Sequence, residues 1–194
     1  MFSGIVEATS RVVKLEDTKG QRVAWIARPR GWKLKAGESV SVDGVCSTVQ
    51  EVNRGTFRVI YMFETLRRTT LGRMSSGCTL NLERSLTLNS LIGGHLVQGH
   101  VDSTARIVGV HSDGAASVYE FSLPERFARY LVEKGSVAVD GISLTVIETR
   151  RPGFSVSLLD YTLQHTTLGA KGRGDSVNVE VDLLAKYVEK LFPS

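Results

Sequence analysis

The chain has 194 residues, of which 42% are hydrophobic and 23% charged, and its formal net charge at pH 7 is +4. This composition is typical of one or two compact domains and excludes a largely disordered chain. The positive charge is small and the lysines and arginines are spread along the chain, which disfavours a nucleic-acid-binding face.

The sequence has no feature of a membrane or secreted protein. No hydrophobic run approaches the roughly 18 residues of a membrane span. The first residues, MFSGIVEATS, include Glu7 and lack the basic stretch of a signal peptide. Cys46 and Cys78 do not have the spacing of a metal site. We therefore expect a cytoplasmic protein with reduced cysteines and no metal.

Short segments in which hydrophobic and polar residues alternate recur along the chain. SVSVDGV (39–45), TFRVIYM (56–62) and NVEVD (178–182) show the alternation most clearly. A period of two predicts β-strands with one buried face, and the turn signals between segments include Asp-Gly pairs and Pro152-Gly153. Strands at this spacing predict an all-β chain built from small closed antiparallel barrels.

Three segments are predicted to be helical. PERFARYLVEKG (124–135) has Pro124 for its first turn and Gly135 for its end, and GWKLKAG (31–37) is a weaker counterpart earlier in the chain. VDLLAKYVEKLF (181–192) carries apolar residues at helical spacing. Because this last helix follows the barrels, its apolar stripe predicts an oligomer contact; packing on its own barrel is the alternative.

The chain contains an internal duplication. VDGVCSTV (42–49) and VDGISLTV (139–146) align at an offset of 97 residues (139 − 42), and three further pairs of segments align nearly in register. The duplication predicts two similar barrel domains, which we place at 1–90 and 91–181, followed by the helix at 182–194. The further pairs are 64–72 with 161–169, 77–83 with 174–180 and, at an offset of 95 (99 − 4), 4–9 with 99–104.

The duplicated segment places small polar side chains on one face of a strand. These are Cys46 and Thr48 in the first copy and Ser143 and Thr145 in the second, because alternate residues of a strand share a face. Such pairs suit hydrogen bonding to a polar ring. The alternative is a structural Asp-Gly turn whose hydroxyls bond to the backbone. Two similar pockets would suit a reaction between two copies of one molecule, although many duplications are only structural.

The segment GGHLVQGHVDST (93–104) holds two histidines among glycines. His95 and His100 are five residues apart in a segment that is predicted to be extended, which does not suggest a metal pair. Either imidazole is able to transfer protons near pH 7, and a structural role is the alternative for His95. His100 aligns with Ile5 of the first copy, so the two barrels are not chemically equivalent.

Four features together resemble the riboflavin synthase family, of the alpha-chain type that dismutates lumazine. They are FSGIVE (2–7), the paired DGxxxTV segments, the paired TLxxTTLG segments and IGGHLVQGHVD (92–102), and they span nearly the whole chain. The resemblance implies two six-stranded Greek-key barrels and a C-terminal helix that joins three chains into a homotrimer. It also implies an active site between the N-terminal barrel of one chain and the C-terminal barrel of its neighbour.

The activity that the resemblance implies is the last step of riboflavin biosynthesis. Two molecules of 6,7-dimethyl-8-ribityllumazine exchange a four-carbon unit, which yields riboflavin and 5-amino-6-(ribitylamino)uracil without a metal or redox cofactor. The C7 methyl group of one lumazine loses a proton, and a side chain or water adds at C7 of the other. The two repeats would then be half-sites that hold two copies of one substrate face to face.

The resemblance also implies the residues of these half-sites. The catalytic residues are Ser143, Asp140, Lys134 and, as an acid or base, His100 in the C-terminal half-site, with Cys46 in the N-terminal one. Substrate would be bound by Thr145, Leu159 and Thr162 in the C-terminal half-site and by Ser39, Cys46, Thr48, Met62, Glu64 and Thr65 in the N-terminal one. Phe2 and Gly4 join the substrate-binding residues.

Two positions depart from the family pattern. Ser47 stands where Leu is usual, and alternation puts it on the face opposite Cys46, which predicts a lost core contact rather than a changed site. Asp160 stands where Pro is frequent, just before Thr162, which bears on the shape of that loop. The alternatives to the enzyme are a non-catalytic lumazine or flavin carrier of the same fold and, with less support, a nucleic-acid-binding barrel with exposed aromatic residues.

Overall fold

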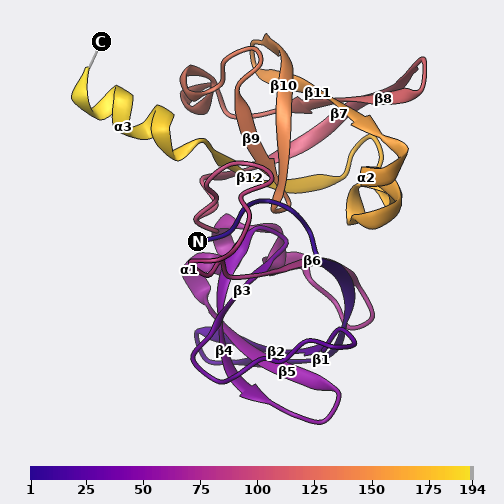
Figure 1. The fold of residues 1–194 in the computed structure, drawn as a ribbon, viewed down its shortest axis with the longest axis vertical. Helices are drawn as coiled ribbons and strands as arrows, with labels where there is room; N and C mark the ends of the chain where they lie inside the picture. Colours follow the sequence, from indigo (N-terminus) through magenta and orange to yellow (C-terminus); the bar gives the residue numbers. More distant parts are fainter. Residues whose placement is uncertain (193–194) are drawn as a thin grey trace.

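The computed structural model describes residues 1–192 and confirms two closed six-stranded antiparallel barrels, one in each half of the chain. In Figure 1 the second barrel lies above the first. The strand order is β1-β2-β5-β4-β3-β6 in the first barrel and β10-β11-β8-β7-β12-β9 in the second. Because the barrels are closed, the second order is also β7-β8-β11-β10-β9-β12, in which each strand has the same neighbours as its counterpart in the first barrel. The order β2-β5-β4-β3 is a Greek key. The strands are β1 (Ala8–Thr18), β2 (Gln21–Ala27), β3 (Ser39–Val42), β4 (Val45–Val52), β5 (Thr56–Met62), β6 (Thr79–Arg84), β7 (Ser103–Asp113), β8 (Ala116–Ser122), β9 (Ser136–Val139), β10 (Ile142–Arg150), β11 (Gly153–Leu159) and β12 (Ser176–Val181).

Alternation along the strands closes each barrel around a hydrophobic interior. In β5, Phe57, Val59 and Tyr61 are buried, whereas the residues between them are only half-buried. The equivalent strand β11 repeats the pattern. Each barrel therefore has its own hydrophobic core. Because closure pairs every strand on both sides, the barrels cannot join by extending a common sheet.

Two predicted helices are wrong or shortened. Residues 31–37 form no helix, and Trp32 and Leu34 of this segment are buried in the core of the first barrel. The helix predicted at 124–135 is a shorter 3-10 helix, η2 (Glu125–Tyr130), which packs against the second core. In both segments the contacts with the barrel core outweigh the local spacing on which the predictions depended.

Other helical elements follow β5 and β11, within the paired TLxxTTLG segments and the residues next to them. They are α1 (Phe63–Arg68) with η1 (Thr70–Arg73) and α2 (Asp160–His165) with η3 (Thr167–Ala170). Helix α3 (Leu183–Leu191) confirms the predicted C-terminal helix and extends away from the barrels in Figure 1. Residues 193 and 194 of the predicted range lie outside the described residues. Within residues 1–192, no helix is long and apolar enough to cross a membrane.

Each half of the chain sends its N-terminal segment onto the other barrel. We name residues 2–6 the first leader and residues 97–101 the second leader. The two pair through Phe2 and Val97, whose backbone N–H groups donate to each other's carbonyl oxygens at 2.7 and 3.0 Å. Val6 of the first leader packs against the core of the second barrel, and its counterpart in the second leader packs against the first core. The strands thus lie within the predicted domain ranges, but the leaders cross between the domains.

The two barrels meet at the Asp-Gly turns of the duplicated segment. A Cβ atom on Gly44 would lie 2.6 Å from the backbone nitrogen of Gly141, and a Cβ atom on Gly141 would lie 2.8 Å from that of Gly44. Both glycines also have positive φ angles, of 79° each. Only glycine allows this conformation and this approach together.

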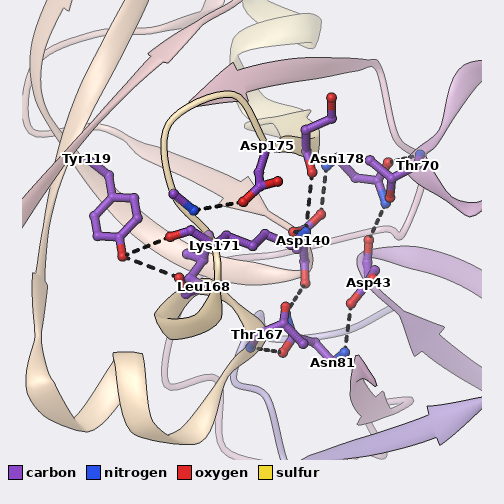
Figure 2. A network of polar contacts seen from close by, with 12 residues as sticks. Asp43, Thr70, Asn81, Tyr119, Asp140, Thr167, Leu168, Lys171, Asp175 and Asn178 are labelled. Atoms are coloured by element: carbon purple, nitrogen blue, oxygen red, sulfur yellow. Dashed lines mark hydrogen bonds and ion pairs between the residues drawn. The ribbon is translucent and has the colours of Figure 1, made fainter. Parts of the chain in front are cut away.

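Two asparagines, one from each half, complete the contact reciprocally (Figure 2). The Asn81 amide donates to the Asp140 carbonyl oxygen at 3.0 Å, and the Asn178 amide donates to the Asp43 carbonyl oxygen at 2.8 Å. The amide oxygens of these asparagines accept the first backbone N–H groups of η3 and η1, at 2.8 and 2.7 Å, in the opposite barrel. Each asparagine therefore bonds to two segments of the other half.

The interface also encloses two buried aspartates and one lysine. Asp140 pairs with the Lys171 ammonium at 2.5 Å, whereas the residue of the first half that aligns with Lys171 is Met74, which has no charge to offer Asp43. Burial raises the pKa of Asp43 to about 8, and repulsion from Asp140 adds to this effect. Burial also raises the pKa of Asp140, against the opposing attraction of Lys171. At neutral pH the contact therefore favours a protonated Asp43 beside an Asp140–Lys171 ion pair.

The raised pKa of Asp43 in the folded protein predicts a pH dependence of the free energy of unfolding, which Asp43→Asn should remove. Native Asp43 keeps its proton up to about pH 8, whereas an unfolded aspartate loses it near pH 4. Its stabilising contribution is therefore complete below about pH 4 and is lost as the pH rises to about 8. Relative to Asp43→Asn, we expect the wild-type free energy of unfolding to fall by up to about 1.4 kcal/mol per pH unit across this range.

Urea titrations at several pH values measure this difference, with Asp113→Asn, which changes an exposed aspartate of β7, as the matched control. The control should follow the wild type. Parallel curves for the wild type and Asp43→Asn would contradict the prediction.

Candidate active site

The predicted polar residues of the duplicated segment lie on the outer faces of the two barrels. Cys46 and Ser143 are half-buried and Thr48 and Thr145 are exposed, while the residues between them face the interior. Ser39 on β3 is paired with Thr48 on β4. On each barrel the outward face therefore presents small polar side chains to solvent, as the alternation predicts.

Ser143 lies beneath the first leader and the segment that contains His95. The Ser143 N–H donates to the Gly4 carbonyl oxygen at 2.7 Å, and the Ser143 hydroxyl is 2.7 Å from His95 Nδ1. The backbone N–H of His95 donates to the Ser3 carbonyl oxygen at 3.2 Å. A Cβ atom on Gly94 would lie 2.6 Å from Ser143 Cβ and 2.3 Å from the Ser3 oxygen. The first leader thus contacts both members of the Ser143–His95 pair.

The environment of His95 favours its neutral form. Burial lowers the pKa of His95, and the negative charge of Asp182 opposes this shift. A neutral imidazole has one nitrogen that accepts a proton. With Nδ1 next to the Ser143 hydroxyl, the pair has the arrangement of a hydroxyl nucleophile and its base.

Cys46 has the equivalent place on the first barrel but different neighbours. Its N–H donates to the carbonyl oxygen of Gly99, in the second leader, at 2.8 Å. Its side chain packs against a small hydrophobic cluster that contains Phe2 and Ala138 and lies apart from the two barrel cores. In the described part of the chain no histidine is hydrogen-bonded to Cys46, so the two half-sites differ in the base that they offer.

His100 lies in the second leader, between Gly99, which contacts Cys46, and Val101, which packs against the core of the first barrel. It follows Gly99 directly in the second leader, and its backbone N–H donates to Glu180 at 2.9 Å. Its side chain is exposed. By sequence His100 belongs to the second half, but the crossing of the second leader carries it to the strand that holds Cys46.

The other predicted residues lie before β9 and at the ends of β5 and β11, in the same two barrels. Lys134 is exposed, and its N–H donates to the Val146 carbonyl oxygen at 2.8 Å, one residue beyond Thr145. Leu159 and Thr162 lie where β11 passes into α2, and Met62, Glu64 and Thr65 lie at the equivalent junction of β5 and α1. Each junction carries at least one exposed side chain, and Met62 and Leu159 are both more than 60% exposed.

Three acidic residues that the sequence analysis singled out lie in different surroundings. Glu64 is exposed and paired with Arg68 and Arg67, which hold the pKa of its carboxyl below the ordinary value. Asp160 is an exposed acidic residue in the first turn of α2, where it suits the helix dipole. Asp140 is fully buried in the contact between the barrels and has no exposed surface toward a half-site. Any effect of Asp140 on the reaction therefore acts through the position of the turn.

Ser47 lies on the inner face of β4, as the alternation predicts. Its hydroxyl donates to the Val45 carbonyl oxygen at 2.9 Å and is 3.0 Å from the Tyr61 hydroxyl. Leu144 and Leu158 stand at the two equivalent positions of the second barrel, and both are buried. A hydrogen-bonded pair thus replaces a leucine pair, and the departure concerns the core of the first barrel.

Comparison with protein families identifies both halves as copies of one domain. A lumazine binding domain matches residues 3–85 and again residues 98–182. The riboflavin synthase of Mycobacterium bovis is 45% identical over 100% of this chain and 99% of its own length. That of Schizosaccharomyces pombe is 40% identical over 98% and 93%, and that of Actinobacillus pleuropneumoniae is 36% identical over 98% and 89%.

Solved structures with the same fold include LumP. The complex of LumP with riboflavin superposes with a TM-score of 0.86, and its complex with 6,7-dimethyl-8-(1'-D-ribityl) lumazine with a TM-score of 0.84. Each covers 93% of this chain and 99% of LumP at 20% sequence identity. At this identity the likeness concerns the fold.

The close approach at Gly94 predicts that Gly94→Ala disturbs the Ser143–His95 pair. The new methyl group would collide with the Ser3 backbone and with Ser143, so the His95 segment must move away. We expect the protein to be destabilised by about 1–3 kcal/mol, which is typical of overpacking. The His95 ring signals in an NMR spectrum should shift as the imidazole leaves the hydroxyl.

Gly93→Ala is the matched control, because its Cβ atom would meet only the flexible side chain of Ile5, at 3.3 Å or more. It should leave the His95 signals unchanged. Equal shifts in both variants would contradict the packing at Gly94.

Proposed function

The chain belongs to the riboflavin synthase family of lumazine-binding proteins, and on this basis we propose that it converts two molecules of 6,7-dimethyl-8-ribityllumazine into riboflavin and 5-amino-6-(ribitylamino)uracil. The observation that carries the proposal is that two copies of one lumazine binding domain fill the chain. A dismutation consumes two copies of one substrate, so related half-sites suit it. The cytoplasmic location and the absence of a cofactor stay predictions.

The carrier alternative is not favoured. Relatives that match this chain at 36–45% identity over nearly their whole length are riboflavin synthases, whereas the ligand-bound LumP structures are 20% identical. Both DGxxxTV segments keep their outward polar pairs, and the second has a histidine bonded to its serine. These are groups that a reaction needs and that binding alone does not require.

The two half-sites differ as the two roles in the reaction differ. One lumazine is attacked at C7, and the other loses a proton from its C7 methyl group. In the second half-site the Ser143 oxygen adds at C7 while its proton passes to His95 Nδ1. In the first half-site the exposed His100, carried there by the second leader, takes the methyl proton. Holding both rings face to face replaces a bimolecular encounter with a local one.

The complete site requires a second copy of the chain. Among residues 1–192, no hydrogen bond or ion pair joins the side chains of the Cys46 half-site to those of the Ser143 half-site, and both faces are open to solvent. Helix α3 is fastened to the second barrel by ion pairs of Lys186 with Asp102 and Glu189 with Arg129. Its apolar side chains stay exposed, which supports a homotrimer through this helix. They are Leu184, Tyr187, Val188 and Leu191.

Ser143→Ala tests the function and the serine together. The wild type, incubated with 6,7-dimethyl-8-ribityllumazine and a chelator, should form one riboflavin for every two lumazines consumed. Ser143→Ala should reduce turnover by about 100-fold or more, the scale of a lost acid–base partnership, with little change in melting temperature. Ser112→Ala, at an exposed position of β7, is the control. Tight lumazine binding without riboflavin formation in the wild type would point instead to a carrier.

Complementation between two inactive variants tests whether the site is shared. Thr48→Arg blocks the outer face of the first barrel and Thr145→Arg that of the second. Each variant alone should be inactive. When the two are unfolded together and refolded as a mixture, a neighbour contact pairs an intact first half-site with an intact second one, and activity should return. Persistent inactivity of a mixture that sediments as a trimer would contradict the shared site.

A further inference from the structure

The paired segments NLE (81–83) and NVE (178–180) carry two buried glutamates that the reaction does not use directly. Glu83 on β6 and Glu180 on β12 are 4% and 3% exposed. Each is two residues after the asparagine that bridges the barrels. Since residues two apart on a strand share a face, the glutamates also face the contact between the halves. A buried carboxylate is costly unless hydrogen bonds compensate for the lost water.

Each glutamate binds the backbone of the leader from its own half. Glu83 accepts the Ser3 N–H and the Ser3 hydroxyl, both at 2.7 Å, and the Gly4 N–H at 3.0 Å. Glu180 accepts the N–H groups of residues 98, 99 and 100 at 2.7–2.9 Å. These stretches of leader lie outside the named strands, so the carboxylates supply acceptors that a neighbouring strand would otherwise provide.

The residues that Glu83 binds are the same residues that bind the Ser143–His95 pair. The Ser3 carbonyl oxygen accepts the His95 N–H at 3.2 Å, and the Gly4 carbonyl oxygen accepts the Ser143 N–H at 2.7 Å. The Glu83 carboxylate therefore accepts the backbone N–H groups of Ser3 and Gly4. The carbonyl oxygens of the same two residues accept the backbone N–H groups of His95 and Ser143. Glu180 has the same relation to Cys46, through Gly99, and to no part of the pair.

We propose that Glu83, a residue of the first barrel, is the positioning residue of the Ser143–His95 pair on the second barrel. Its carboxylate fixes the first leader, and the leader sets the distance between the serine hydroxyl and the imidazole. Glu180 is its counterpart for the Cys46 half-site. The inference deepens the proposed function, because the value of the pair for catalysis rests on that proposal.

Glu83→Gln tests the inference, with Glu180→Gln as the matched control. In either variant an amide NH₂ group replaces one carboxylate oxygen, so at least one leader N–H faces a donor. The two variants should lose similar stability, because both sites are buried and make three hydrogen bonds. The specific readout is the pH titration of the His95 ring, followed by NMR.

We expect Glu83→Gln to raise the pKa of His95 toward its ordinary value, because a loosened leader admits water to the imidazole. Glu180→Gln should leave this titration unchanged. Turnover of Glu83→Gln should fall about tenfold or more through kcat rather than KM. If Glu83→Gln does not fold, Glu83→Asp, which keeps the charge but withdraws it by one methylene group, is measured in the same way.

An unchanged His95 titration in a folded Glu83 variant overturns the inference, as does an equal change in Glu180→Gln. A shifted His95 titration with wild-type turnover overturns the role of Glu83 in the reaction. The activity of Ser143→Ala then shows whether the positioning by Glu83 or the proposed chemistry of the pair is wrong. If Ser143→Ala is inactive, Glu83 is not needed to position the pair for catalysis. If Ser143→Ala is fully active, the proposed chemistry of the Ser143–His95 pair is wrong, although Glu83 still positions the two side chains.

Discussion

The arrangement of the two barrels depends on the contact between Gly44 and Gly141, whose backbones approach so closely that neither position admits a Cβ atom. A closed barrel has no free strand edge, so two barrels must join through turns and side chains. The reciprocal bonds of Asn81 and Asn178 serve this purpose, since each amide reaches the turn and a 3-10 helix of the opposite half. This exchange pairs the side-chain amides of both asparagines with carbonyl oxygens of both turns, which offsets the cost of burying these groups.

The crossing leaders connect this contact to the two outer faces. Each leader is held by a glutamate of its own half and then bonds to the outward strand of the other half, so Gly4 meets Ser143 and Gly99 meets Cys46. Each half-site is thus a strand of one barrel covered by a leader of the other. The duplication therefore does not simply produce two independent pockets, because neither outer face is complete without the other half.

The shared backbone framework carries different side chains in the two halves. In the alignment of the two halves, Lys171 corresponds to Met74, Ser143 to Cys46 and Leu144 to Ser47. His95 is hydrogen-bonded in one half-site alone. The hydrogen bonds that hold the leaders and the turns are common to both halves, whereas the groups able to exchange protons are not. A reaction that assigns two copies of one molecule to different roles fits this combination of a common framework and unequal chemistry.

The repeat, the strands and the outward polar pairs were predictable from sequence, because the period of two and the offset of 97 residues (139 − 42) are properties of the order of residues. The same local pattern failed at 31–37, where burial of Trp32 in the barrel core prevents a helix. It also did not reveal that the second leader brings the residue next to His100 to Cys46, and it left His95 undecided. The sequence by itself determined the fold class, the family and the identity of the polar groups. The tertiary structure decided which groups meet, because the leaders leave their own half and their partners are backbone atoms, which every residue carries and no side-chain pattern reveals.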